Sequence, residues 1–135
     1  MQPAQEHVAA ELAASPEVKA YLGSPGWAAF VGTGAGQVLW ASPNCAAVLG
    51  HPPEAMAGRN AWNLLIAPED VRPAAELRAL MADGDTQIWA RYKTADGTRH
   101  WFRVEILGRR GLYIAVVKRE TDPAMHKWHG QLRHV

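Results

Sequence analysis

Alternation of apolar and polar residues is clearest over residues 86–107, in two arms that flank an Ala-Asp-Gly turn at 95–97. Because side chains alternate between the two faces of a strand, even-numbered residues such as Phe102 share one apolar face. The Asp-Gly pair favours the positive φ angles of a tight reversal. The stretch therefore predicts a β-hairpin with one face toward a core and the other polar except for Trp89 and Trp101.

Similar patterns predict the remaining elements. Apolar residues at helical spacing predict helices, and runs of β-branched and aromatic residues predict strands. The expected order is two helices (5–14 and 16–22), a hairpin (27–32 and 37–41), short helices (42–49 and from Asn60), a longer helix (71–82), the central hairpin, a last strand (111–119) and a terminal helix. This order predicts an α+β fold, a five-stranded antiparallel sheet with short helices on one face.

The chain is expected to have three segments. Residues 1–26 form amphipathic N-terminal helices that cap the sheet or mediate dimerisation, and residues 27–121 form the sheet domain. Residues 122–135 begin a C-terminal linker or coiled-coil helix, since their apolar residues follow the spacing of a seam. These signal-helix residues are Met125, Trp128, Leu132 and Val135.

Composition narrows the choice of partners. Fourteen basic and thirteen acidic residues leave a net charge of +1, which favours neither nucleic acid nor direct contact with an anionic membrane. A single cysteine excludes an internal disulfide, and no signal peptide or membrane-spanning run is present in the sequence. A cytoplasmic location is expected.

Catalytic and metal-binding patterns are absent from the sequence, so we expect no enzyme. The glycine turn at 33–36 lacks the lysine of a phosphate-binding loop, and Cys45 has no cation within three residues to activate its thiol. His126, His129 and His134 spread around a helix too widely for one metal site.

Four motifs in sequence resemble those of PAS domains, and the resemblance covers residues 27–121. They are FVGTGAGQVLWASPNCAAVLG (30–50), GHPPEAMAGR (50–59), APEDV (67–71) and RYKTADGTRHWF (91–102). The resemblance implies an antiparallel sheet whose inner face and short helices enclose a small pocket. It also implies a module that senses a ligand, cofactor or partner and signals through flanking helices.

Departures from that family restrict the cofactor. Light-sensing flavin members have a reactive cysteine after Gly-Arg-Asn, whereas Ala61 follows the run at 58–60, so a cysteinyl-flavin adduct is disfavoured. The amides that hold flavin in that subfamily are missing at Ala90 and in the last strand. Residues 71–82 lack the histidine that commonly ligates haem. Two alternatives stay open, a small organic ligand and a non-covalently bound flavin, and the identity of the cofactor is unknown.

Two surfaces are predicted to carry function. The inner face holds either an organic ligand or a filled core, with pocket residues Phe30, Trp40, Cys45, Leu49, Trp62, Leu65, Leu77, Tyr92, Phe102, Val104, Ile114 and Val116. Aromatic residues on the outer face need a cover, from the N-terminal helices or a second subunit. The predicted dimer or partner interface is Val8, Leu12, Val18, Tyr21, Leu22, Trp27, Trp89, Trp101, Tyr113 and Val117.

The functional hypothesis is a sensory and dimerisation module of a signal-transduction protein, such as the histidine kinase of a two-component system. A change at the pocket would shift the central hairpin and last strand and pass to the C-terminal helix and its output domain. The alternative is a ligand-free scaffold that binds a partner protein through the outer sheet face and terminal helices.

Overall fold

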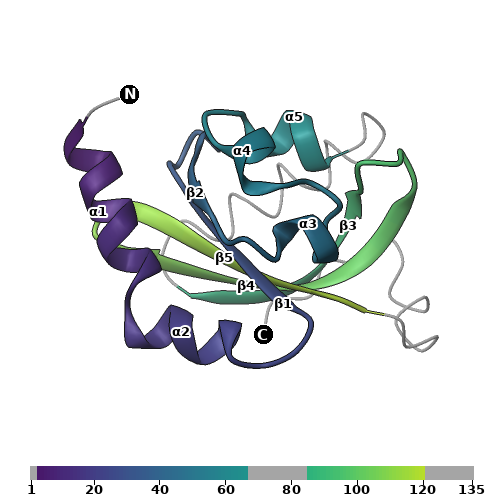
Figure 1. Cartoon of the computed structure of the whole chain (residues 1–135), viewed down its shortest axis with the longest axis horizontal. Helices are drawn as coiled ribbons and strands as arrows, with labels where there is room; N and C mark the ends of the chain where they lie inside the picture. The colour runs from purple at the N-terminus through teal and green to yellow at the C-terminus, as the bar shows by residue number, and fades with distance from the viewer. Residues whose placement is uncertain (1–2, 67–84, 121–135) are drawn as a thin grey trace.

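Five antiparallel strands form a single sheet in the computed structural model, which describes residues 3–66 and 85–120 (Figure 1). The strands lie in the order β2-β1-β5-β4-β3. Their bounds are β1 Trp27–Gly32, β2 Val38–Ala41, β3 Thr86–Lys93, β4 Arg99–Arg109 and β5 Leu112–Arg119. The predicted five-stranded antiparallel α+β fold is therefore confirmed, with β5 as the central strand.

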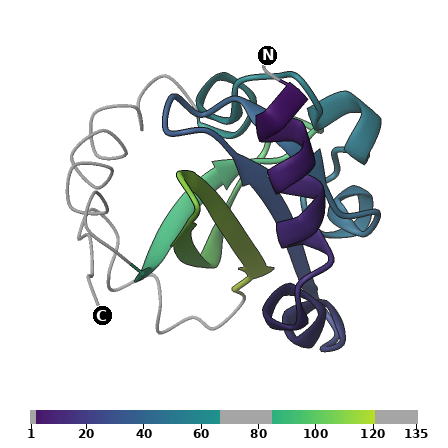
Figure 2. The ribbon, with the colours of Figure 1, turned by 90° about the vertical axis from the view of Figure 1, so that its left-hand side faces the viewer.

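Short helices lie on both sides of the sheet. Figure 1 shows α3 (Cys45–Val48), α4 (Pro53–Met56) and α5 (Ala61–Leu65) gathered over one face. The helices α1 (Pro3–Ala13) and α2 (Pro16–Leu22) pack on the other face, and Figure 2 shows α1 lying across β1 and β2. We call the face under α3–α5 the inner face and the face under α1 and α2 the outer face.

Local signals explain where two of these helices begin. The Ser15 hydroxyl accepts a hydrogen bond from the Val18 N–H at 3.3 Å, and Pro16 occupies the first turn of α2, as the sequence predicts. The Asn60 side chain accepts a bond from the Asn63 N–H at 3.4 Å, at the start of α5. The helix expected over 42–49 is shorter, because Ser42 and Asn44 use their side chains in the turn that precedes α3.

The central hairpin turns at the predicted Asp-Gly pair. The Thr94 N–H donates to the Thr98 carbonyl at 2.9 Å, and Gly97 has a φ of 85°. Asp96 Oδ1 accepts bonds from the Thr94 hydroxyl at 2.6 Å and from the Thr98 N–H at 3.0 Å. The turn side chains thus satisfy the backbone groups that the reversal leaves unpaired.

The sheet buries one apolar cluster on each face. The inner cluster comprises Ala28, Phe30, Val38, Ala41, Cys45, Leu49, Met56, Leu65, Tyr92, Phe102, Val104, Ile106, Ala115 and Val117. The outer cluster comprises Ala9, Leu12, Val18, Ala29, Val31, Leu107, Leu112, Ile114 and Val116. The sheet is therefore the middle of three layers.

The predicted helix over 71–82 and the signal-helix residues Met125, Trp128, Leu132 and Val135 lie outside the described residues. Among the helices that the structure describes, none has the length and apolar character needed to cross a membrane.

Candidate functional site

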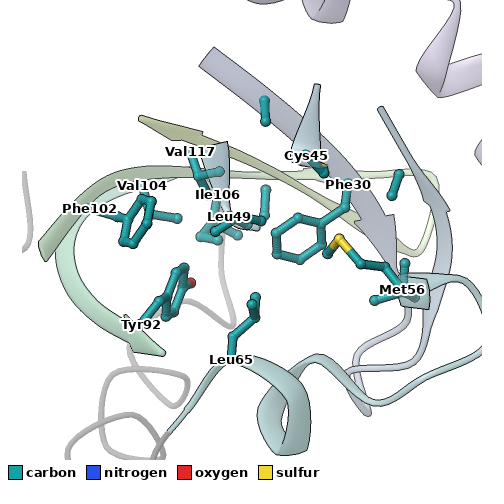
Figure 3. Close-up of a cluster of buried hydrophobic side chains, with 14 residues drawn as sticks. Phe30, Cys45, Leu49, Met56, Leu65, Tyr92, Phe102, Val104, Ile106 and Val117 are labelled. Carbon is teal, nitrogen blue, oxygen red and sulfur yellow. The ribbon is translucent and has the colours of Figure 1, made fainter. Parts of the chain in front are cut away.

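The inner cluster brings together most of the predicted pocket residues (Figure 3). Strands β1, β3, β4 and β5 each present every second side chain to it, because side chains alternate along a strand. The predicted residues found there are Phe30, Cys45, Leu49, Leu65, Tyr92, Phe102 and Val104. The structure places these side chains on one surface, and ligand binding by them stays a prediction.

Met56 was missed by the sequence analysis and is fully buried in the inner cluster. It comes from α4, and Figure 3 shows its thioether beside Phe30. Met56 is the one large apolar side chain between Gly50 and Asn60, a signal that could have placed it inside. Methionine is flexible and fills irregular gaps, which fits its place between α4 and the sheet.

Trp40 packs against the outer cluster, so its assignment to the pocket is wrong. Strict alternation puts Trp40 on the same face as Val38, which is inside. The pairing of β1 with β2 shifts, however: Val31 pairs with Trp40 and Gly32 pairs with Val38, which leaves Leu39 as an extra residue. A β-bulge of this kind reverses the facing of the residues beyond it.

The facing of β5 is also the reverse of the prediction. Ile114 and Val116 belong to the outer cluster, Val117 belongs to the inner cluster, and Tyr113 packs against the inner cluster. Both faces of this central strand are apolar, so alternation alone does not identify the inner one. The register does, because directly paired residues share a face: Val117 pairs with Val104.

Three residues of the predicted pocket and interface are not placed by the structure. Leu77 lies outside the described residues. The backbones of Trp62 in α5 and Trp89 in β3 are described, whereas their side chains lie outside the description.

Tyr92 supplies a polar group to the inner cluster. Its ring packs on Phe102 with centroids 5.6 Å apart, and Figure 3 shows the two rings side by side. Burial raises the pKa of the Tyr92 phenol far above its ordinary value, so the hydroxyl keeps its proton at any physiological pH. Tyr92 is therefore available as a hydrogen-bond donor within an apolar surface.

Cys45 is fully buried and acts as a structural residue. Its thiol donates to the Ala29 carbonyl at 3.5 Å and lies 3.6 Å from the Ser42 hydroxyl. Burial is the main cause that raises the pKa of the thiol above its ordinary value. Since the thiolate is the reactive form, this environment disfavours redox or adduct chemistry at Cys45.

Ser42 and Asn44 anchor α3 to the first strand. The Ser42 hydroxyl accepts a bond from the Ala29 N–H at 3.0 Å and donates to Asn44 Oδ1 at 2.5 Å. The Asn44 amide in turn donates to the Trp27 carbonyl. This buried polar chain fixes the cover of the inner face relative to β1.

The outer face is covered by the chain's own N-terminal helices. Of the predicted interface residues, Leu12 and Val18 are buried in the outer cluster. Val8, Tyr21, Leu22 and Trp27 are partly buried and pack against it. The structure thus shows intramolecular capping, one of the two alternatives left open by the sequence, and dimerisation stays a prediction.

Trp101 lies on the side of β4 opposite to Phe102 and is half-buried. It pairs directly with Arg91 across β3 and β4, and the Arg91 guanidinium carbon lies 5.9 Å from the centre of its ring. A cation over an indole face is stabilising at this distance. Trp101 therefore occupies the outer face, where the sequence places it.

Metal binding has no support in the part of the chain that the structure describes. No group of three or more His, Cys, Asp or Glu side chains there is arranged to hold an ion. The described side chains of the inner cluster are apolar apart from Tyr92 and Cys45.

These features define a class, a small α+β domain in which helices cover both faces of one antiparallel sheet. A family model described as the PAS fold matches residues 23–116, which is more than half of the chain. The chain belongs to the PAS-fold family, and the resemblance seen in its motifs is confirmed.

Solved structures with the same fold include several sensory proteins. A light-oxygen-voltage domain studied with a flavin analogue is 19% identical, with a TM-score of 0.73, and the match covers 88% of this chain and 95% of that one. The PAS domain of the Cronobacter turicensis quorum-sensing receptor RpfR, in complex with C12:0, is 12% identical, with a TM-score of 0.63 and coverage of 73% and 97%. The dark structure of the blue-light photoreceptor Aureochrome1 LOV is 21% identical, with a TM-score of 0.68 and coverage of 87% and 91%. No curated protein matches the chain.

Proposed function

We propose that this PAS domain is a sensory module that binds a small apolar ligand at the inner cluster and transmits the change to its flanking helices. The observation that carries the proposal is the alternation within β5. Val117 contributes to the inner cluster and Val116, its neighbour in sequence, contributes to the outer cluster beneath α1 and α2. Displacement of β5 by a ligand therefore reaches both layers.

The inner surface suits a ligand of limited polarity. Its fully buried side chains include Leu49, Met56 and Phe102, and Tyr92 adds a hydroxyl donor to the same cluster. Ligand sites are mostly apolar with a few placed polar groups, which matches this composition. A neutral molecule with one hydrogen-bond acceptor would pair with Tyr92. A charged ligand without a partner would be disfavoured, because desolvating a buried ion costs on the order of several kcal/mol.

The inner strands do not fit the flavin mode of the light-sensing subfamily. A flavin ring has a polar edge that needs amide-like partners, and β5 presents Tyr113, Ala115 and Val117 to the inner side. On β4 the inner residues are likewise apolar, as Phe102 and Val104 show. The Asn60 amide is used elsewhere, since it donates to the Ala35 carbonyl at 3.2 Å.

The alternative function is a ligand-free interaction scaffold. It is favoured by the complete burial of Phe102, Leu49 and Met56, which belong to one apolar cluster. In that case the outer sheet face and the terminal helices would bind a partner protein, and the inner cluster would serve stability alone.

Native mass spectrometry and methyl NMR separate the two functions. A retained small mass, or shifts at Leu49, Val104 and Val117 on titration with the probe C12:0, is expected for the sensor. Transmission additionally predicts smaller shifts at Ile114 and Val116, which lie on the opposite face. A protein that purifies without added mass and shows no methyl shift with apolar probes would favour the scaffold.

The proposal also covers the assembly of the protein and the destination of its signal. We expect a cytoplasmic homodimer without catalytic activity, in which residues 122–135 pass the signal to an output domain such as a histidine kinase. Analytical ultracentrifugation tests the homodimer, and fusion of the chain to a kinase output domain tests whether inner-cluster variants such as Tyr92→Phe alter the output.

A further inference from the structure

The turn between β4 and β5 carries two adjacent arginines, and each contacts one N-terminal helix. Arg110 Nη1 lies 3.3 Å from Glu11 Oε2 on α1, and Arg109 Nη2 lies 2.9 Å from Glu17 Oε2 on α2. The two helices are therefore held at this end of the sheet by ion pairs as well as by the outer cluster.

Arg109 has a second carboxylate partner, which belongs to neither helix. Its guanidinium makes a two-pronged contact with Asp85, with Nη1–Oδ1 at 2.7 Å and Nη2–Oδ2 at 3.0 Å. Asp85 immediately precedes β3, and its Oδ1 also accepts the Gly108 N–H at 3.3 Å. Paired parallel bonds of this kind fix the plane of the guanidinium.

The geometry makes Asp85 an organiser of the contact with α2. The Arg109 side chain is one-third exposed, so an isolated pair with Glu17 would be a surface ion pair of little strength. With Asp85 on one side and the Gly108 carbonyl 2.8 Å from Nη1, the guanidinium is held so that Nη2 is directed at Glu17. The entropy cost of ordering the arginine is shared among all three partners.

We propose that Arg109 is a latch that couples the start of β3 to the N-terminal helix α2. Strand β3 contributes Tyr92 to the inner cluster, whereas α2 packs on the outer cluster. Movement of Asp85 with the start of β3 changes how firmly Glu17 is held, because both carboxylates bind the Arg109 guanidinium. The latch operates whatever displaces β3, so it does not depend on the proposed ligand.

Hydrogen exchange of the whole chain tests the latch. The Asp85→Asn variant keeps the side-chain size and removes the charge, and we expect exchange of the α2 amides to become about threefold faster, the size of effect that loss of a surface ion pair produces. Amides of β1 and β5 should exchange as in the wild type, because the change is local. The Arg109→Lys variant, which keeps the charge and cannot form the fork, should behave like Asp85→Asn.

Two further variants make the test specific. Glu17→Gln should accelerate α2 exchange by itself, and Asp85→Asn combined with Glu17→Gln should add nothing further, since both act through one guanidinium. Glu54→Gln, which removes an exposed carboxylate in α4 over the inner face, is the matched control and should leave α2 unchanged.

Two results would contradict the coupling between Asp85 and α2. If Asp85 merely competes with Glu17 for Arg109, Asp85→Asn leaves α2 exchange unchanged or slows it, and the coupling is disproved. Additive effects in the double variant would also overturn the proposal. In 1 M salt the difference between Asp85→Asn and the wild type should shrink, because surface ion pairs are screened at that ionic strength.

Discussion

Val116 and Val117 are consecutive residues of β5, both fully buried, and they belong to different apolar clusters. Val116 pairs with Ala29 on the outer side, and Val117 pairs with Val104 on the inner side. One strand thus has close-packed neighbours on both faces. Because packed interiors transmit small shifts rather than absorbing them, a displacement of β5 would act on both clusters at once.

The two valines give a matched pair of substitutions. Val116→Ala and Val117→Ala remove the same two methyl groups, and each should lower the free energy of unfolding by about 2 kcal/mol through lost burial and a small cavity. Urea denaturation measures that loss. Hydrogen exchange distinguishes the sites: Val116→Ala should accelerate exchange in α1 and α2, and Val117→Ala in α3. Identical exchange patterns would show that the two clusters are not separate.

The Ser42 hydroxyl supports a second prediction. In Ser42→Ala the buried Ala29 N–H loses its acceptor and Asn44 Oδ1 loses its donor, so stability should fall by about 1–3 kcal/mol, the cost of an unsatisfied buried polar group. Ser24→Ala, at an exposed position before β1, is the control and should change stability by less than about 0.5 kcal/mol. Equal effects at the two serines would contradict the proposed anchor.

Patterning along the chain identified the sheet but only part of the site. The central hairpin was predictable because polar and apolar residues alternate there, so Phe102 and Trp101 are correctly placed on opposite faces. On β5 that contrast is missing, since a central strand is apolar on both sides, and Val116 was assigned to the wrong face. The assignment of Trp40 to the inner face was wrong for another reason, because no pattern in the sequence predicted the bulge at Leu39.

The ionic contacts of the β4–β5 turn could not be predicted at all. Arg109 is 92 residues from Glu17 and 24 residues from Asp85, and charged residues on a surface carry no periodic signal of their partners. Only the folded topology, which brings α2, the start of β3 and this turn to one end of the sheet, creates the contact (Figure 1).

Arg110 provides a test of backbone strain in the turn between β4 and β5. It has a φ of 51°, in the left-handed region, and Gly111 follows with a φ of 81°. A side chain with a Cβ costs about 1–2 kcal/mol there, and asparagine tolerates the region better than other non-glycine residues. We therefore expect the unfolding free energy of the Arg110→Asn protein to be about 0.5–1 kcal/mol higher than that of the Arg110→Ala protein. This difference is a part of the conformational cost of a side chain in the left-handed region.

Both Arg110 variants lose the ion pair with Glu11, so the difference between their unfolding free energies reports the cost of the backbone conformation alone. Thermal denaturation of the two proteins measures it. If alanine matches or exceeds asparagine at this position, backbone strain is not significant at the turn.

His51 makes stability depend on pH. Partial burial of its ring lowers the pKa of His51 below the ordinary value of 6.5, with Lys93 as the nearby cation, and its Nε2 is buried without a hydrogen-bond partner among the described residues. The unfolded chain therefore binds the proton more readily than the folded one. Stability from this group is complete above pH 6.5 and is lost as the pH falls toward the folded pKa.

We expect the unfolding free energy to decline as the pH falls from about 7.5 to about 5.5, a window that spans the unperturbed histidine pKa, and His51→Asn to make that decline shallower. His100, whose pKa is also lowered by partial burial and by Arg119, contributes in the same direction, so His51→Asn removes only part of the slope. His7→Gln changes an exposed ring on α1 and serves as the control. Chemical denaturation at closely spaced pH values gives the slope of unfolding free energy against pH for each protein. If that slope is as steep in His51→Asn as in the wild type, protonation of the His51 ring does not contribute to the loss of stability.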